Sequence, residues 1–423
     1  MNSRERVMAV LRHEMPDRVP VDLGSTAVSS IHQRANNALK ALLGIEADEP
    51  VHDVTQGIVV PDEQILQRFG VDFRRVALRP PSTAAAASPS GSENTYFDEW
   101  GMRRQRTELY WEIVEHPLAD AKVEDLRHYP FGSAQGRPWP DPHDPCRVAG
   151  LAEEAQRLYE ETDYALVADF LGGGIFEQAL WMRGFEQFMM DLVTDEPFAT
   201  ALLDSLLELY IEFYAVYLEA VGPYVQIVAL GDDLGMQTGP LISPKLYRRL
   251  IKPRHKELYD FIHSHTEAKI MHHTCGSVFP FVQDLIDVGV DILNPIQTSA
   301  RGMDPVALKR EFGERLVFHG GIDVQQILPF ATPERVREEV KRIVAILGQG
   351  GGYVLAPSHN IQADVPPENI VAMYEAIQEV SEQADSQRSP TAWATWDRRS
   401  SSTQCKRSLS SSTPIRCAST LAW

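Results

Sequence analysis

Short apolar segments that end in polar residues recur along most of this chain, and helical segments separate them. We expect these apolar segments to be β-strands, ending near Asp22, Arg75, Asp169, Asp233, Cys275, Gln297, Asp323 and His359. Such a succession of strand–helix units is typical of a closed (β/α)8 TIM barrel, in which the carboxyl ends of the parallel strands meet at one face. The alternative is an open, doubly wound sheet. However, the chain has no Gly-x-Gly-x-x-Gly fingerprint, and Gly172-Gly173-Gly174 is too short to count as one.

The pattern predicts a single barrel domain over residues 1–384, with an irregular insertion at 79–150 after the second strand. The insertion is rich in prolines, which interrupt regular helices, but it also has aromatic residues that a simple linker would lack. We predict a hairpin over 96–115 that packs over one end of the barrel as a candidate lid. Residues 385–423 show no periodicity, so we expect an unstructured tail there.

The composition argues against several classes of partner. The chain has 423 residues, 43% of them hydrophobic, and can bury one large core or two ordinary ones. Its formal net charge of −19 disfavours nucleic acid and anionic membrane surfaces, which need a basic face. No apolar run is long enough to cross a membrane. The cysteines are far apart and no secretory leader is visible, which predicts a cytoplasmic location.

The fifth predicted strand ends in His273-Thr274-Cys275-Gly276. His273 and Cys275 are two positions apart, so an extended backbone points them to the same face, whereas His272 points the opposite way. Imidazole and thiolate are ligands that zinc prefers, and this pair would supply half of a tetrahedral shell. The alternative is that Cys275 is a small buried hydrophobic residue and His273 a hydrogen-bonded core residue, because His-x-Cys is a short and common pattern.

Other polar residues at strand ends are candidates for roles around such a site. Asp232 and Asp233 could orient a metal-bound histidine or accept a proton during catalysis; the alternative is a helix cap or a buried ion pair. Weaker candidates for contact with a substrate are Asp169, Gln237, His319 and Asp323. For the last two, hydrogen bonds to neighbouring loops are the favoured explanation.

A set of motifs in a fixed order resembles the uroporphyrinogen decarboxylase superfamily. The motifs are His273-Thr274-Cys275-Gly276, Asn294-Pro295, His319-Gly320-Gly321-Ile322-Asp323 and Pro357-Ser358-His359-Asn360-Ile361-Gln362 with Pro367-Glu368-Asn369. The likeness covers roughly residues 4–380. It implies a (β/α)8 barrel, in agreement with the strand count, and it adds Asn294 to the candidates for contact with a substrate.

Two branches of this superfamily differ in sequence at positions where this chain can be compared with each of them. The tetrapyrrole decarboxylases carry an arginine-rich segment near the amino terminus, whereas residues 20–30 here contain no arginine. Where the decarboxylases place an aspartate at the end of the second strand, the nearest match here is Arg79. A substrate with many carboxylates needs cationic partners at the strand ends, so both departures count against a decarboxylase.

The methyltransferase branch holds zinc with the His-x-Cys pair and a third ligand from the eighth strand, usually a cysteine. This chain has His359 there, so the resemblance implies a shell of His273, Cys275 and His359. His359 also matches a decarboxylase histidine near a substrate carboxylate, which makes it a catalytic candidate in either branch. Zinc would deprotonate a thiol, which would then attack a methyl group on a corrinoid. In the opposite direction, the pocket would pass a methyl group from a small molecule to a corrinoid protein.

The resemblance therefore implies a zinc-dependent methyltransferase that moves a methyl group between a corrinoid and a thiol or other small molecule. The alternatives are a metal-free uroporphyrinogen decarboxylase and a non-catalytic barrel that binds a corrinoid. No corrinoid-binding Asp-x-His-x-x-Gly sequence occurs, so methylcobalamin or another corrinoid would come as free cofactor or on a partner protein. By analogy with the family, a homodimer is a further expectation.

Overall fold

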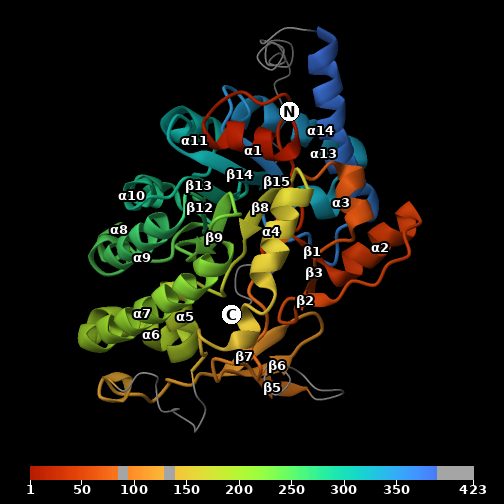
Figure 1. The fold of residues 1–423 in the computed structure, drawn as a ribbon. Coiled ribbons are helices and arrows are strands. Elements are labelled where there is room, and N and C mark those ends of the chain that lie inside the picture. Colours follow the sequence, from red (N-terminus) through yellow and green to blue (C-terminus); the bar gives the residue numbers. More distant parts are fainter. Residues whose placement is uncertain (84–93, 128–138, 388–423) are drawn as a thin grey trace.

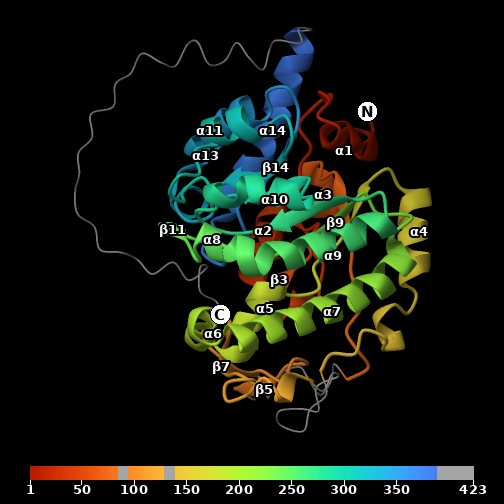
Figure 2. The same ribbon diagram turned by 90° about the vertical axis from the view of Figure 1, so that its left-hand side faces the viewer.

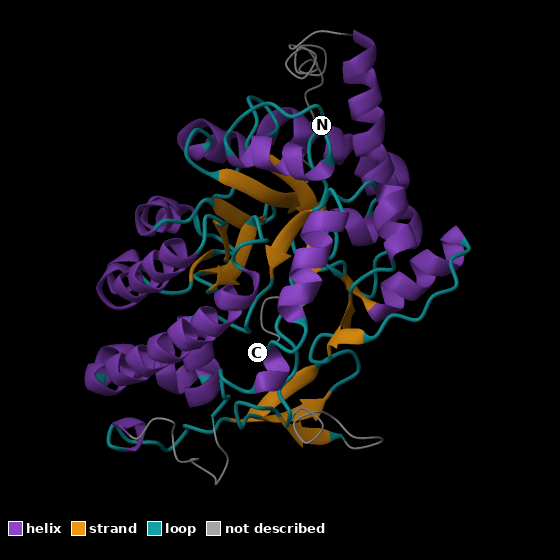
Figure 3. Cartoon of the chain, in the orientation of Figure 1, coloured by secondary structure: helices purple, strands orange, loops and turns teal. Residues whose placement is uncertain are grey.

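A curled parallel sheet surrounded by helices forms the centre of the molecule (Figures 1 and 3). The computed structural model describes residues 1–83, 94–127 and 139–387. Seven parallel strands pair in the order β15-β14-β13-β12-β9-β8-β4. Their bounds are β4 Phe73–Val76, β8 Ala165–Ala168, β9 Ile227–Gly231, β12 Lys269–His273, β13 Ile292–Ile296, β14 Val317–Ile322 and β15 Tyr353–Pro357. The predicted TIM-barrel class of α/β fold is confirmed.

The predicted first strand, which was expected to end at Asp22, is reduced to a single bridge. Val21 pairs in parallel with Leu355 of β15, and its carbonyl accepts the backbone N–H of Asp72 at 2.9 Å. A regular ladder cannot continue here, because Pro20 has no N–H and the N–H of Val21 donates to the Asp72 side chain at 2.8 Å. This segment still links β15 to β4, the two edge strands of the parallel sheet.

Helices follow the strands as predicted, with two interruptions. The helical segment after β8 is divided into α5 and α6 at Gly184, which has a φ of 91°. The helical segment before β12 contains a π-helical turn, Tyr247–Ile251, between α8 and α9. The helices are α1 Ser3–Leu11, α2 Gln33–Leu43, α3 Glu63–Phe69, α4 Leu151–Glu161, α5 Ile175–Arg183, α6 Phe185–Thr194, α7 Glu196–Val221, α8 Pro244–Leu246, α9 Lys252–His265, α10 Val282–Val288, α11 Pro305–Phe312, α12 Ile327–Phe330, α13 Pro333–Leu347 and α14 Pro367–Gln387. Among the described residues, no helix combines the length and the apolar character that crossing a bilayer requires.

Small antiparallel sheets lie outside the barrel. The predicted hairpin over 96–115 is a three-stranded sheet of β5 Thr95–Phe97, β6 Arg103–Arg106 and β7 Trp111–Glu115. Figure 1 shows it at the end of the molecule opposite α1. A second sheet, of β1 Ile31–His32, β3 Ile58–Val59 and β2 Val51–Asp53, was not predicted, and β10 Gly235–Met236 pairs with β11 Gly239–Pro240. Residues 84–93 and 128–138 of the insertion and 388–423 of the predicted tail lie outside the described residues.

Successive side chains of each strand point to opposite faces of the sheet, so the apolar residues form two cores. The larger core lies between the sheet and the outer helices. The smaller core fills the barrel interior and takes residues from each strand of the parallel sheet: Phe73, Ala165, Val167, Ile227, Ala229, Met271, Ile292, Val317 and Val354. Val7, Val10 and Leu11 of α1 pack against these residues, so α1 closes the amino-terminal end of the barrel (Figure 2).

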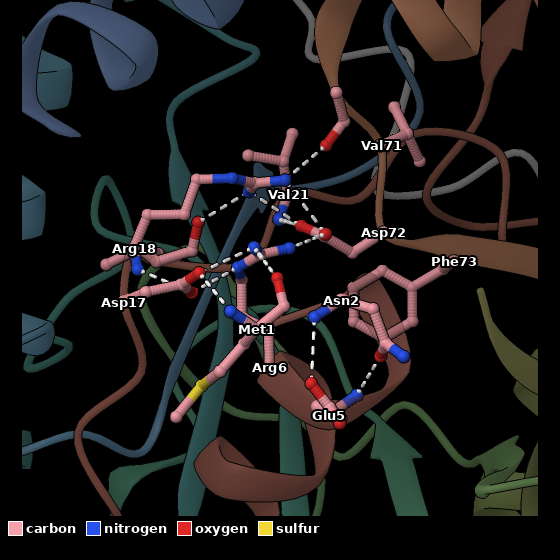
Figure 4. A network of polar contacts seen from close by, with 12 residues as sticks. Met1, Asn2, Glu5, Arg6, Asp17, Arg18, Val21, Val71, Asp72 and Phe73 are labelled. Carbon is pink, nitrogen blue, oxygen red and sulfur yellow. Dashed lines mark hydrogen bonds and ion pairs between the residues drawn. The ribbon is translucent and has the colours of Figure 1, made fainter. Parts of the chain in front are cut away.

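A polar network ties α1 to that end of the barrel (Figure 4). The carboxylate of Asp72 has no exposed surface and accepts hydrogen bonds from Arg6 and Arg18, each at 2.7 Å. Arg6 also pairs with Asp17 at 2.6 Å. Partial burial raises the pKa of Asp17, but hydrogen bonds from Arg6 and the terminal amine outweigh it and bring the pKa to about 2. The network thus holds the segment around Val21 in place at the end of the barrel away from the predicted site.

Candidate functional site

The alternation that builds the interior core also carries polar side chains into the carboxyl-terminal end of the barrel. On β12, Met271 belongs to the interior core, so His273, two residues later, points inward as well. His272 points outward, as predicted, toward the helical layer. The parallel register places His273 between Gly231 of β9 and Asn294 of β13. A Cβ on Gly231 would lie 2.4 Å from the carbonyl oxygen of His273 and 2.8 Å from its Cβ, so glycine permits this close approach of the two strands.

The predicted metal ligands come together at this end. The ligand atoms of His273, Cys275 and His359 all lie within 4.8 Å of one another, and we call these residues the triad. The Sγ of Cys275 is 3.3 Å from Nε2 of His273, and the two histidine ring centroids are 5.6 Å apart. Cys275 and His273 are buried, whereas His359 is partly exposed.

A chain of hydrogen bonds fixes which nitrogen of His273 faces the other ligands. Its Nδ1 lies 2.5 Å from Oδ1 of Asn294, and an amide oxygen can only accept, so Nδ1 carries the proton. The Asn294 amide then donates to Nδ1 of His319 at 2.7 Å, and Nε2–H of His319 donates to Asp22 at 3.0 Å. Every donor in this chain meets an acceptor. The lone pair of His273 Nε2 is therefore directed toward Cys275, whose thiol lies at hydrogen-bonding distance.

The electrostatic environment keeps the triad imidazoles neutral. Desolvation, followed by the neighbouring His273, lowers the pKa of His359 to about 3. Desolvation also lowers the pKa of His273, against the opposing effect of the Asp233 carboxylate. In addition, Nδ1 of His359 is buried without a hydrogen-bond partner in the described structure. Two neutral imidazoles with free lone pairs and one thiol sulfur fit the ligand preferences of zinc, and three ligands leave one position of a tetrahedron for a substrate.

The triad histidines lie at the inner end of a cavity of about 730 Å³. Asp233 also lines it, and its Oδ1 accepts the backbone N–H of Cys275 at 2.6 Å and lies 3.9 Å from Nε2 of His273. The insertion supplies the outer wall, including Trp100 and Tyr110. The predicted position of the insertion over one end of the barrel therefore corresponds to the mouth of this cavity.

Asp232, predicted beside Asp233 as a catalytic candidate, turns away from the cavity wall. Its carboxylate accepts the backbone N–H groups of Phe176 at 3.0 Å and Glu177 at 2.7 Å, and His255 lies 2.7 Å from it. Asp232 thus takes the helix-cap role that the sequence left as the alternative, at the start of α5. A Cβ on Gly174 would lie 2.3 Å from the Asp232 carboxylate, which explains a glycine in the turn before this helix.

The residues predicted to contact a substrate make contacts within the protein. Asn294 and His319 form the hydrogen-bonded chain behind His273. Gln237 donates to the backbone of a neighbouring loop at 2.7 Å, and Asp323 accepts a backbone N–H two residues along the chain at 2.7 Å. Asp169 forms an ion pair with Arg75. Of these five residues, none lies among those that line the cavity.

Four arginines line the cavity wall, and none of them was predicted to face it: Arg75 was named only as a strand end, Arg79 only as a departure from the decarboxylases, and the two arginines of the insertion were not considered. Each of them pairs with a carboxylate; the pairs are Arg75–Asp169, Arg79–Glu154, Arg104–Asp98 and Arg147–Glu99. The alternation on β4 was a usable signal for Arg75, since Phe73 is in the interior core and the residue two positions later points the same way.

Glu177 and Gln178 of α5 also line the cavity and were missed. Gln178 is fully buried, and neither its amide nitrogen nor its amide oxygen has a hydrogen-bond partner in the described part of the chain. No sequence signal marked either residue, because they lie on a helix that follows a strand and not at a strand end.

Comparison with known proteins places the chain among barrel enzymes. The family model described as uroporphyrinogen decarboxylase (URO-D) matches residues 126–380. A uroporphyrinogen decarboxylase from Aeromonas salmonicida is 24% identical over 283 residues, which cover 65% of this chain and 74% of that protein. One from Psychromonas ingrahamii is 36% identical over 101 residues, which cover 24% of this chain and only 27% of that protein. Among solved structures, a methyltransferase from Methanosarcina mazei is similar in fold, with a TM-score of 0.60, 19% identity, and coverage of 90% of this chain and 99% of that chain.

Proposed function

The chain belongs to the uroporphyrinogen decarboxylase family, and on that premise we propose that it is a zinc-dependent methyltransferase that moves a methyl group between a corrinoid and a thiol or another small molecule. One observation carries the proposal: the ligand atoms of His273, Cys275 and His359 lie within 4.8 Å of one another at the inner end of a cavity. The fold shared with the methyltransferase from Methanosarcina mazei is compatible with it.

The side chains around the triad have separate tasks in this proposal. His273, Cys275 and His359 would hold the zinc, which when bound makes a thiol a nucleophile at neutral pH. Asn294 keeps the proton of His273 on Nδ1, so that Nε2 is ready to bind. The Asp233 carboxylate accepts the backbone N–H of Cys275 and so holds the loop after β12. It lies 3.9 Å from Nε2 of His273 and would take up the proton that an incoming thiol loses. The corrinoid would come from outside the chain.

Elemental analysis of the full chain, purified without chelator, tests the zinc site. We expect about one zinc per chain in the unaltered protein, with loss of zinc in both Cys275→Ser and His359→Ala, since a site with two remaining ligands binds zinc far more weakly. Cys146→Ser is the matched control, because Cys146 is an exposed free cysteine away from the triad. Absence of metal from the unaltered protein, or its retention by Cys275→Ser, would refute the proposed site. Methylcobalamin with a thiol is the first substrate pair to assay.

A second candidate function is decarboxylation of a carboxylated tetrapyrrole. It is favoured by the arginines on the cavity wall and by the names of the curated relatives. Against it, each of those arginines already pairs with a carboxylate of this chain, so a polyanionic substrate would have to displace those partners. Uroporphyrinogen turnover by the protein in the presence of a chelator would establish this function in place of zinc-dependent methyl transfer.

A further inference from the structure

The cavity wall beside the triad carries two carboxyl groups that form no ion pair with an arginine or lysine of the described residues. Glu177 of α5 and Asp233 after β9 both line the cavity. The arginines among the described lining residues all pair with other carboxylates, at positions from β4 and from the insertion. A cation that enters the cavity could therefore pair with either carboxyl.

A second feature of the same wall indicates a ligand. Gln178 follows Glu177 on α5, is 0% exposed, and has both polar atoms of its carboxamide without a partner. A buried amide without hydrogen bonds costs free energy, and such groups in native proteins usually meet a partner. Because Gln178 lines the cavity, a bound molecule can provide that partner.

Aromatic rings form the rest of this wall. They favour a cationic ligand, and the nearby end of α5 offers no free site for an anion. The ring of Phe170 lies edge-on to His273 at 5.9 Å between centroids, and Trp181 packs so closely on Gly173 that a Cβ there would lie 2.6 Å from the indole. Aromatic faces attract cations, and quaternary ammonium groups especially. The amino-terminal end of α5, which would otherwise attract an anion, is already occupied by the Asp232 carboxylate.

We propose that the wall formed by Phe170, Glu177, Gln178, Trp181 and Asp233 binds a methylated ammonium compound that also carries a hydroxyl or carbonyl group. The ammonium group lies between the carboxyls of Glu177 and Asp233, and the hydroxyl or carbonyl bonds to the carboxamide of Gln178. This inference rests on the proposed function, because it names the class of methyl donor. A C–N bond of the ammonium compound would break, its methyl group would pass to a reduced corrinoid supplied from outside the chain, and the amine would leave with the electron pair of that bond.

Calorimetric titration with choline and with its uncharged carbon analogue, 3,3-dimethylbutan-1-ol, tests this inference. The two probes have the same shape and the same hydroxyl group, so they differ only in charge. We expect the unaltered protein to bind choline about tenfold more tightly or better, given the attraction of a cation to carboxylates and rings. Equal affinity for the two probes would overturn the inference, and this comparison needs no variant.

Three variants sharpen the test. Glu177→Gln should remove most of the preference for choline while keeping affinity for the carbon analogue, which also shows that the variant is folded. Glu154→Gln is the matched control, because Glu154 lines the outer part of the same cavity and pairs with Arg79. Gln178→Leu should abolish the preference for choline over ethyltrimethylammonium, which lacks the hydroxyl. A full preference for choline in Glu177→Gln would contradict the inference.

Zinc content measured on the same preparations separates this inference from the proposed function. A preference for choline in protein without zinc would support the ammonium site and remove zinc-dependent methyl transfer. Zinc at the triad without any preference for choline would overturn the ammonium site and leave the proposed function in place.

Discussion

The two ends of the barrel differ in how their carboxyl groups are paired: Asp72 at the amino-terminal end has two cationic partners, whereas two carboxyls at the other end have none among the described residues. At the amino-terminal end, Asp72 accepts hydrogen bonds from Arg6, Arg18 and the backbone of Val21. At the carboxyl-terminal end, Asp233 and Glu177 face a cavity and have no arginine or lysine partner among the described residues. The first arrangement stabilises the closure of the fold, whereas the second leaves two carboxyls that could pair with a bound cation.

The same substitution at the two ends should have very different effects on stability. Asp72→Asn leaves the buried Arg6 and the partly buried Arg18 without the carboxylate that they share, so we expect the free energy of unfolding to fall by about 3–5 kcal/mol. Asp233→Asn removes a carboxyl whose pKa burial already raises, and its amide oxygen can still accept the N–H of Cys275, so we expect a change within about 1 kcal/mol. Urea denaturation of both variants without metal measures the contrast. Equal losses would show that the two ends contribute alike to stability.

A substitution behind the triad should weaken metal binding more than it weakens the fold. His319→Phe interrupts the chain that orients His273 through Asn294, so we expect zinc affinity to fall about 10- to 100-fold. Competition with a chromophoric chelator measures this affinity. His272→Phe is the matched control, because His272 is equally buried but contacts Tyr259 on the opposite face of β12. Equal losses of affinity in the two variants would assign the effect to general packing.

The two ends should also respond to acid in different pH ranges. The folded-state pKa of His359 is about 3, below its usual 6.5, so the unfolded chain binds the proton first and stability falls as pH drops from about 6.5 toward 3. In metal-free protein, His359→Gln should flatten this decline, by at most about 1.4 kcal/mol per pH unit. Denaturation midpoints at several pH values provide the measurement.

The smallest effect is expected at the other end of the barrel. The pKa of Asp17 is depressed from 3.8 to about 2, so its contribution is present above pH 4 and is lost as pH falls toward 2. Asp17→Asn should therefore change the acid dependence only below about pH 4. The effect should be modest, because the Asp17 side chain is 40% exposed and solvent screens its ion pair. A change near pH 6 in this variant would contradict the separation of the two ranges.

The parts of the fold that depend on local pattern could be predicted from the sequence. The strands of the parallel sheet and the long helices follow from hydrophobic alternation and capping residues. The two-residue period on β12 predicted the inward direction of His273, whereas His359 was added by the family resemblance. The prediction of a regular first strand was wrong. The N–H of Val21 bonds to the side chain of Asp72, a residue 51 positions away that local pattern cannot take into account. The small sheet of β1, β2 and β3 has strands too short to leave a clear pattern.

The surroundings of the triad depended on tertiary contacts and were predicted less well. Asp232 and Asp233 are adjacent in sequence, yet one caps α5 and the other faces the cavity. The position of α5 decides which of the two carboxylates caps the helix and which faces the cavity. No local sequence signal indicates that position. Glu177 and Gln178 were missed for the same reason, since their contact with the cavity follows from the position of the helix and not from its composition.

The hydrogen-bonded chain behind His273 ends on Asp22, next to the residue that joins the edges of the sheet. The backbone N–H of Asp22 donates to Leu355 of β15 at 2.9 Å, so one residue takes part both in the contact that joins the first segment to β15, the seam of the barrel, and in the orientation of His273. If the triad binds zinc as proposed, metal binding and the integrity of the seam should be thermodynamically linked. Loading with zinc should slow amide hydrogen exchange at Asp22 and Leu355, and loosening the amino-terminal segment should speed metal release. Hydrogen exchange at Asp22 and Leu355 would then indicate whether zinc is bound in the cavity.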